Sequence, residues 1–436
     1  MLACTTLVST FTSSIFSTAT TNVAAIYHVS PEVALLGLAL YVLGFATGPI
    51  CWAPLSELRG RRLPILIGMF GFTVFQFAVA TAKDLQTILI CRFFGGFFGA
   101  CPLAVVAAVF SDIFDNRYRG LAITFFSMTV FTGPLFAPFI GGFIVDSYLG
   151  WRWTSYLPGI MGAAALICDV FFLGETYPPV VLIEKASELR RRTKNWGIHA
   201  KQEEIEVDFR ELVQKNFSRP IRILTTEPIV LLLSIYMAFI YGLLYLFLTA
   251  YPIVFQQIHG FNKGIGGLPY FGMVVGQLLA GLYIISQQPA YNRKLKANNN
   301  VPIPEWRLPP VIMGGVAFAG GLFWFGWSGY KPTIHWIVPT LSGLLTGFGL
   351  LAIFLQSLNY LVDAYLLLYV FDIFLSLRRF VFTDYFFPPV RSAASAIAAN
   401  TFLRSLAGAG FPLFATYMVC PHRHSAPFSL SLFHIT

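Results

Sequence analysis

The segment Ala53-Pro-Leu-Ser-Glu-Leu-Arg-Gly-Arg-Arg62 separates two long uncharged runs, at residues 33–53 and 63–82. Each run has about 20 residues, which is enough to cross a bilayer as an α-helix. A short loop with one carboxylate and three arginines therefore joins two predicted membrane helices at one bilayer face. Gly60 permits a tight turn that a residue with a Cβ resists. The guanidinium groups of Arg61 and Arg62 can reach helix carbonyl ends and neighbouring carboxylates.

The composition excludes an ordinary soluble domain. The 436 residues are 56% hydrophobic and 11% charged, with a mean hydropathy of +0.69, whereas soluble domains carry about 25% charged residues. The net charge of +9 does not indicate nucleic-acid binding, because the basic residues lie in short loops between apolar runs rather than beside stacking aromatics. We therefore expect the lipid bilayer, and no nucleic acid, as a partner.

The apolar runs predict eleven membrane spans. They lie at 2–26, 33–53, 63–82, 86–110, 121–145, 153–173, 229–254, 265–286, 310–328, 335–357 and 393–418. The longest polar stretch divides six spans from five. The predicted domains are a bundle at 1–173, a linker at 174–228, and a second bundle at 229–418 followed by an atypical tail at 419–436.

The distribution of Lys and Arg predicts the orientation. Of the 29 basic residues, 22 lie in loops 54–62, 111–120, 174–228, 287–309 and 358–392, and only 4 lie in the alternate loops. Loops rich in Lys and Arg stay in the cytoplasm. The N-terminus and the central linker are therefore expected to be cytoplasmic.

The Pro-Leu-Ser-Glu-x-x-Gly-Arg-Arg pattern resembles the loop between helices 2 and 3 of the major facilitator superfamily. The variant here is similar to the fungal drug:proton antiporter branch with twelve helices, which includes polyamine and multidrug exporters. The resemblance implies an all-α membrane protein with the major facilitator fold. Its two pseudo-symmetric helix bundles, with six and about five spans here, rock around a central cavity.

The same resemblance implies a charge network that holds the two halves closed on the cytoplasmic side. Asp112, at the end of the fourth span, is expected beside Arg61, and Arg119 begins the fifth helix. Loop salt bridges without a gating role are the alternative. The residues assigned to this gate are Glu57, Gly60, Arg61, Arg62, Asp112 and Arg119.

Arg92 lies within the fourth predicted span, in Leu-Ile-Cys-Arg-Phe-Phe-Gly-Gly. Placing an arginine inside a membrane costs at least about 2.5 kcal/mol, so it is expected to face a cavity or a carboxylate. Antiporters of the superfamily carry a similar Arg-x-x-x-Gly pattern that is implicated in proton coupling. The alternative is that Arg92 extends to the nearby interface.

The fifth span carries glycines and prolines that resemble the antiporter signature of drug exporters. This motif comprises Gly133, Pro134, Pro138, Gly141 and Gly142. Each proline removes a helix hydrogen bond, and the glycines allow close helix approach. Simple packing is the alternative. The resemblance is the main reason to expect export rather than uptake.

Several polar residues within spans are candidates to line a substrate cavity: Ser9, Ser13, Tyr241, Tyr245, Gln277 and Gln356. Serine hydroxyls can instead bond back to their own helix, and tyrosines near helix ends are often interfacial anchors. Asp169, near the end of the sixth span, is expected to meet lipid headgroups.

No P-loop or paired catalytic carboxylates are recognised in the sequence, so neither an ATP-driven pump nor an enzyme is expected. No cofactor or metal is expected either. The group Cys420-Pro-His-Arg-His424 has ligating residue types, but no second ligand pair matches it.

The sequence thus predicts a monomeric, multi-pass transporter in the plasma membrane. It is expected to export drugs, polyamines or secondary metabolites in exchange for protons. An importer of small solutes, an inactive remnant and a non-transporting sensor remain as alternatives.

The resemblance is interrupted at two places. Residues 370–392 interrupt a loop that family members keep short, and Asp372, Arg378 and Arg379 divide this insert into pieces too short to span a bilayer. The insert is expected to be poorly ordered or interfacial. The tail at 419–436 supplies no twelfth span, so an incomplete or mis-spliced chain is expected.

Overall fold

A computed structural model describes residues 1–114, 116–200, 203, 221–299, 301–378 and 393–419. The regular elements within these residues are helices. Those of the first half are α1 (Leu2–Ile15), η1 (Phe16–Ala19), α2 (Thr20–Tyr27), α3 (Pro31–Arg59), α4 (Arg62–Thr81), α5 (Leu85–Ile113), α6 (Asn116–Asp146), α7 (Trp153–Phe172) and α8 (Pro178–Thr193). Those of the second half are α10 (Pro228–Tyr251), η3 (Pro252–Ile258), η4 (Ile265–Gly267), α11 (Tyr270–Ala297), η5 (Pro304–Arg307), α12 (Leu308–Gly329), α13 (Ile337–Arg378) and α14 (Ala393–Val419).

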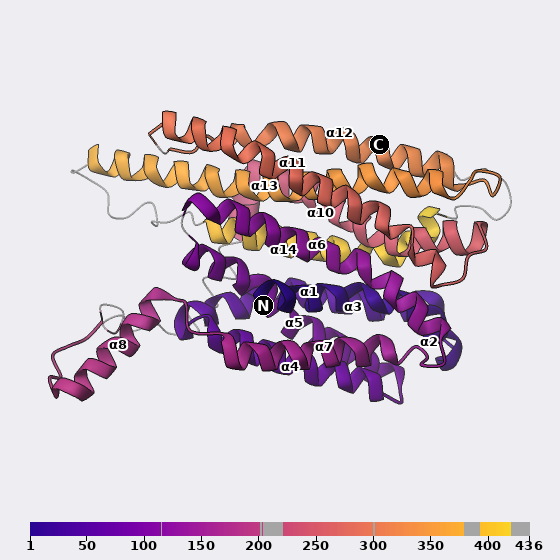
Figure 1. Ribbon diagram of the computed structural model, residues 1–436, viewed down its shortest axis with the longest axis horizontal. Helices are drawn as coiled ribbons and strands as arrows, with labels where there is room; N and C mark the ends of the chain where they lie inside the picture. The colour runs from indigo at the N-terminus through magenta and orange to yellow at the C-terminus, as the bar shows by residue number, and fades with distance from the viewer. Residues whose placement is uncertain (115, 201–202, 204–220, 300, 379–392, 420–436) are drawn as a thin grey trace.

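The long helices lie side by side with their axes roughly along one direction (Figure 1). In the described part of the chain, nine helical segments are long and apolar enough to cross a membrane. The predicted all-α membrane fold is therefore confirmed. Helices α4, α5 and α7 lie on one side and α10 to α13 on the other (Figure 1). The two sides are joined by contacts of α3 with α14 and of α6 with α11.

Close approach of α3 and α5 depends on glycines that face each other. A Cβ on Gly44 would lie 2.5 Å from the backbone nitrogen of Phe97, and one on Gly96 would overlap the carbonyl of Tyr41. Small residues at membrane-helix interfaces allow this backbone contact, which supplies dispersion attraction where no hydrophobic effect acts between helices.

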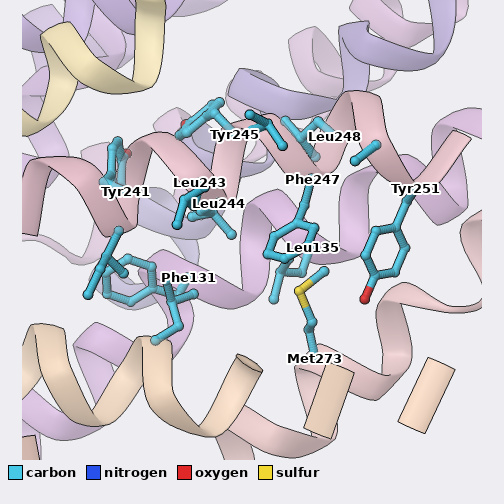
Figure 2. Close-up of a cluster of buried hydrophobic side chains, with 14 of the residues drawn as sticks. Phe131, Leu135, Tyr241, Leu243, Leu244, Tyr245, Phe247, Leu248, Tyr251 and Met273 are labelled. Atoms are coloured by element: carbon cyan, nitrogen blue, oxygen red, sulfur yellow. The ribbon is translucent and has the colours of Figure 1, made fainter. Parts of the chain in front are cut away.

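The part of α10 nearest its C-terminal end is buried on all sides, as expected of a helix that is apolar all round. Figure 2 shows Tyr241, Tyr245 and Tyr251 on this helix, with Phe131 and other apolar side chains packed nearby. Phe131 belongs to α6, so this cluster joins the two sides of the molecule.

The predicted first span at 2–26 is wrong in one respect, because it is not a continuous helix. It consists of α1, the tighter turn η1, and α2. Hydroxyls around the break bond to carbonyls three residues back: Ser13 to Thr10, Thr18 to Ile15 and Thr20 to Ser17. Such bonds compete with the regular helix pattern and bend helices.

Two helices extend well beyond their predicted spans. Helix α11 continues to Ala297, and α13 continues to Arg378 rather than ending near 357. The first nine residues of the insert, 370–378, therefore prolong a helix and are not an irregular segment. The apolar runs set the predicted ends, but a charge ends a membrane span without ending a helix, and residues 358–378 of α13 contain no glycine or proline. Residues 379–392, the tail 420–436 and Cys420–His424 lie outside the described residues.

The α3–α5 contact gives a stability test. We expect Gly44→Val to lower the free energy of unfolding by about 1–3 kcal/mol or to prevent folding, because the added methyls overpack a backbone contact. The measurement is the thermal midpoint and the monodisperse yield in detergent. Gly320→Val is the matched control, because a Cβ at that exposed α12 position meets nothing within 4 Å. Equal effects of the two substitutions would contradict this account of the interface.

Candidate functional site

The predicted pairing of Arg61 with Asp112 is present. Arg61 Nε lies 3.1 Å from Asp112 Oδ2, and the two side chains are only 10% and 19% exposed. Arg61 Nη1 donates to Ser56 Oγ at 2.8 Å, and the guanidinium carbon lies 4.6 Å from the centre of the Tyr177 ring. One arginine thus ties the start of α4 to the ends of α3 and α5 and to the segment that follows α7.

Glu175, which the sequence did not single out, completes this group. Its carboxylate accepts the backbone N–H groups of Arg61 at 2.8 Å and Arg62 at 3.2 Å. These are unpaired donors at the N-terminus of α4, and a carboxylate there is also favoured by the helix dipole. We call Arg61, Asp112 and Glu175 the linker-end cluster, because α8 of the linker begins beside it. The sequence feature that could have identified Glu175 is a lone acidic residue directly after an apolar run.

Gly60 is required by this arrangement. Its φ is +85°, a conformation that strains any residue with a side chain. A Cβ on Gly60 would also overlap the Glu175 carboxylate. The glycine therefore serves two purposes, turning the chain and letting Glu175 reach the α4 N-terminus.

The other predicted gate residues lie at the edge of the cluster. Arg62 is exposed, and its Nη2 donates to the carbonyl of Val170 at 3.2 Å. Glu57 is exposed and makes no ion pair with another residue of the described chain. Arg119 lies in the first turn of α6, and its side chain is outside the described residues. Burial raises the pKa of the Tyr177 hydroxyl beside the cluster.

A second charge cluster in the other half was not predicted. Arg307 Nε lies 2.9 Å from Asp363 Oδ2, the Tyr291 hydroxyl donates to the same oxygen at 3.1 Å, and Arg307 lies 3.8 Å from the Tyr291 ring centre. Arg307 directly precedes α12, as Arg61 precedes α4, and Asp363 lies on α13. The expected pseudo-symmetry of the two bundles was the signal that could have found this pair.

Arg92 is fully buried rather than extended to a surface. It lies on α5, where its Nε donates to the carbonyl of Gly37 at 2.9 Å and its Nη1 to that of Thr12 at 3.3 Å. The guanidinium lies between the rings of Phe16 and Tyr41, 4.6 Å from each centre. Its Nη2 has no hydrogen-bond partner among the described residues. Arg92 therefore connects α5 with α1 and α3 without a carboxylate.

The glycine–proline motif of α6 packs against two other segments. A Cβ on Gly133 would collide with Thr10 of α1, and one on Gly141 would collide with Thr18 of η1. The carbonyl of Pro134 accepts a hydrogen bond from Ser14 at 2.8 Å. On another face, Gly142 meets the backbone of residues 263–264, and the Pro138 carbonyl lies 3.0 Å from the position of a Cβ on Gly267. The motif thus lies between α1 and the second half of the chain.

The six cavity candidates are all buried, but they do not form one group. Ser9 donates to the carbonyl of Gly99, and its own carbonyl accepts from Tyr41, so it is engaged between α1, α3 and α5. Gln277 on α11 accepts from Thr132 of α6 at 3.4 Å. Gln356 lies on α13, and its Oε1 has no hydrogen-bond partner in the described chain.

Three of the candidates do come together. The Tyr245 hydroxyl donates to Ser13 Oγ at 2.8 Å, and the Tyr241 and Tyr245 ring centres are 5.1 Å apart. Ser13 is on α1 and the tyrosines are on α10, so this contact crosses between the halves. Arg404 of α14 lies beside Tyr241, with 5.3 Å from its guanidinium carbon to the ring centre. The sequence showed Arg404 inside a span but assigned it no role.

Asp169 does not meet headgroups as expected. It is fully buried, and Thr5 Oγ1 lies 3.3 Å from its Oδ2. The first and sixth predicted spans pack together here, and this packing is what removes the carboxylate from the surface.

The end of the bundle opposite the linker is held by Lys263. Its ammonium donates to Asn22 Oδ1 at 2.6 Å and Thr21 Oγ1 at 3.0 Å, and Asp146 accepts the next backbone N–H, that of Gly264, at 3.2 Å. Burial lowers the pKa of Lys263, an effect that the nearby Asp146 opposes. Both ends of the bundle thus carry polar links between helices, and those at this end join the two halves.

Comparison with known proteins agrees with this architecture. The family description "Major Facilitator Superfamily" matches residues 2–412. An uncharacterized transporter of Schizosaccharomyces pombe is 50% identical over 418 residues, which cover 96% of this chain and 73% of the relative. The multidrug transporter TPO1_2 of Candida glabrata is 48% identical over 410 residues, covering 94% of this chain. The chain spans 66% of the length of that second relative.

A solved structure shares the fold. The partially occluded inward-open form of the xylose transporter XylE from E. coli superposes with a TM-score of 0.64 at 17% identity, covering 98% of this chain and 91% of that one. At this identity the likeness concerns the fold alone.

The linker-end cluster gives a second stability test. We expect Gly60→Ala to lower the free energy of unfolding by about 2–4 kcal/mol, because backbone strain of about 1–3 kcal/mol is added to displacement of Glu175 from the α4 N-terminus. Denaturant or thermal unfolding in detergent measures this. Gly150→Ala is the matched control, since Gly150 also has a positive φ, +73°, but a Cβ there meets nothing within 4 Å. A loss no larger at Gly60 than at Gly150 would leave Glu175 without a role.

Proposed function

Because the chain belongs to the Major Facilitator Superfamily, we propose that it is a proton-coupled secondary transporter that exports small organic molecules by alternating access. Drugs, polyamines and secondary metabolites are the substrate classes considered. The 22 basic residues on one set of loops support a cytoplasmic N-terminus and linker, and we place the protein in the plasma membrane. The named multidrug transporter among its relatives supports export.

The observation that carries the proposal is the linker-end cluster. An ion pair removed from water is costly to break one-sidedly, because the remaining charge is left without compensation. Arg61 and Asp112 therefore favour one arrangement of the α4 and α5 ends within the first half, and a change of state that moves these ends has to offset the cost of rearranging them. Such a bistable contact is what a two-state transporter requires.

Proton coupling is assigned to the surroundings of Arg92. The buried cation is held only by two carbonyls and two rings, so its local field favours any negative or proton-releasing group that approaches. Its contacts include Thr12 of α1 and Gly37 of α3, both in the first half. A change in its position would therefore be felt by the helices that meet the second half.

The test of the whole proposal is efflux. Cells that lack their own drug exporters and express this chain should release loaded substrate from a panel of azoles, polyamines and secondary metabolites. An uncoupler that collapses the proton gradient should stop this release. Efflux that continues with the uncoupler contradicts proton antiport. Accumulation inside the cells would indicate an importer, and binding without flux would indicate a sensor.

Replacement of Arg92 tests the coupling assignment. We expect Arg92→Ala to abolish efflux while insertion and folding persist. The two carbonyls that Arg92 contacts, those of Gly37 and Thr12, belong to helices, so each can keep its hydrogen bond within the helix when the guanidinium is removed. Arg92→Lys should be partly active at best, since an ammonium does not replace a planar guanidinium. The matched control is Arg152→Ala, an exposed loop arginine that also donates to a carbonyl, that of Ala82. Near-normal efflux in Arg92→Ala would remove Arg92 from the coupling mechanism.

A further inference from the structure

Arg404 is buried near the middle of α14, and no hydrogen bond joins its side chain to another of the described residues. Its exposed fraction is 8%, and its Nε has no acceptor in the described part of the chain. Arg92, the other arginine inside the bundle, donates to two carbonyls. No such bond from Arg404 to another described residue is found. A guanidinium has five N–H donors, so this one is unusually poorly satisfied for its depth.

Aromatic rings surround this guanidinium. Its carbon lies 5.3 Å from the ring centre of Tyr241 and 5.8 Å from that of Phe354. Phe131 lies 4.9 Å from Phe354, centre to centre, and 6.5 Å from Tyr241. Figure 2 shows Phe131 and Tyr241 next to each other in the buried cluster. The rings come from α6, α10 and α13, so the set spans both halves.

The position of Arg404 is fixed by close packing of α14 on α10. A Cβ on Gly408, one turn further along α14, would lie 2.9 Å from the Tyr241 ring. Because glycine has no side chain at this position, α14 and α10 can approach each other closely. Arg404 is thereby kept beside Tyr241 rather than turned toward lipid.

The charge of Arg404 is not balanced by a carboxylate of the described residues. Of the acidic residues in the described part of the chain, Asp169 and Asp363 are buried. Asp169 is bonded to Thr5, and Asp363 is paired with Arg307. Cation–π contacts recover about 2 kcal/mol at a desolvated site, but the donors of the guanidinium remain unused.

We propose that Arg404, with Tyr241, Phe354 and Phe131, binds the carboxylate and ring of an aromatic organic anion. A planar guanidinium matches a carboxylate with two parallel hydrogen bonds. In this conformation the three rings are buried and pack against one another, so an apolar or aromatic ligand body reaches them when the two halves separate. The one positive charge of Arg404 fits a monoanion, and it disfavours polyamines, because like charges repel in a low dielectric.

This inference names the substrate class of the proposed exporter and therefore rests on the proposed function. The position of the site agrees with the general rule that transporters of this superfamily bind substrates near the bilayer midplane, at the interface of the two halves. An anion also leaves a cell with an inside-negative membrane potential, which favours its export by about 2.3 kcal/mol per 100 mV.

Equilibrium binding to the purified 436-residue chain in detergent tests the proposal by calorimetry. The probes share one ring system and differ in charge: 2-naphthoate, 2-naphthylmethanol and 2-naphthylmethylammonium, in a chloride-free buffer. We expect naphthoate to bind about tenfold or more tightly than the alcohol, as a charge-assisted hydrogen bond implies. The ammonium compound should bind most weakly.

Variants separate a ligand contact from a structural role. Arg404→Gln should weaken naphthoate at least about tenfold and leave the alcohol unchanged, and Arg404→Lys should fall between. Without ligand, Arg404→Gln should melt at or above the temperature of the parent chain, because it removes an unbalanced buried charge. A structural arginine would instead lower that temperature. Arg191→Gln, an exposed change in α8, is the matched control for loss of one charge.

Several outcomes would overturn the proposal. They are equal binding of the three probes, tightest binding of the ammonium compound, undiminished naphthoate binding to Arg404→Gln, and displacement of naphthoate by millimolar chloride. If Arg404→Gln does not fold, the probe comparison and Arg404→Lys still decide. Anion binding without efflux would contradict the transport proposal only, whereas efflux without anion selectivity would contradict this inference only.

Discussion

The cost of removing a guanidinium from water is the constraint on which the rest of this structure depends. Four arginines lie wholly or largely out of water, and each is compensated differently. Arg61 and Arg307 pair with aspartates near helix ends. Arg92 donates hydrogen bonds to two carbonyls and lies against two aromatic rings, whereas Arg404 contacts only aromatic rings among the described residues. The two ion pairs occur near helix ends, where aspartates are available and water is near, and the two arginines without a carboxylate partner lie inside long helices.

Each half pairs a largely buried arginine with an aspartate, and the helices that carry the two residues are equivalent in the two halves. An arginine directly before the third long helix of each half meets an aspartate on the fourth, and a tyrosine ring covers it. Only the first half adds Glu175, which requires Gly60 and holds the α4 N-terminus. The cluster in the first half therefore joins four chain segments, while that in the second joins three. This asymmetry assigns the stronger constraint to the first half, at the point from which α8 and the linker depart.

The helices that meet between the halves are built for close contact rather than for strong bonding. Helix α1 offers hydroxyls that mostly bond to its own carbonyls, and Gly142 of α6 packs against the backbone of residues 263–264 in the second half. Ser13 donates to the carbonyl of Thr10 and also accepts a hydrogen bond from Tyr245 across the interface. Sliding or separating surfaces of this kind costs little free energy, because few hydrogen bonds are broken. Rocking of the halves is thus opposed by polar links mainly at the end opposite the linker, where Lys263 and Gly264 bond to residues of the first half.

The sequence by itself determined the helical membrane fold, because apolar run length and the charge between runs are local properties, and its resemblance to the superfamily predicted the Arg61–Asp112 pair. Only the tertiary structure decided which helices continue past the bilayer, such as α13, since helix ends depend on backbone propensity rather than on charge alone. It also decided the partners of Glu175 and the pairing of Arg307 with Asp363, which are distant in sequence. The isolation of Arg404 is likewise a tertiary property. No residue pattern reports that a buried charge lacks a partner, because that depends on what every neighbouring helix places around it.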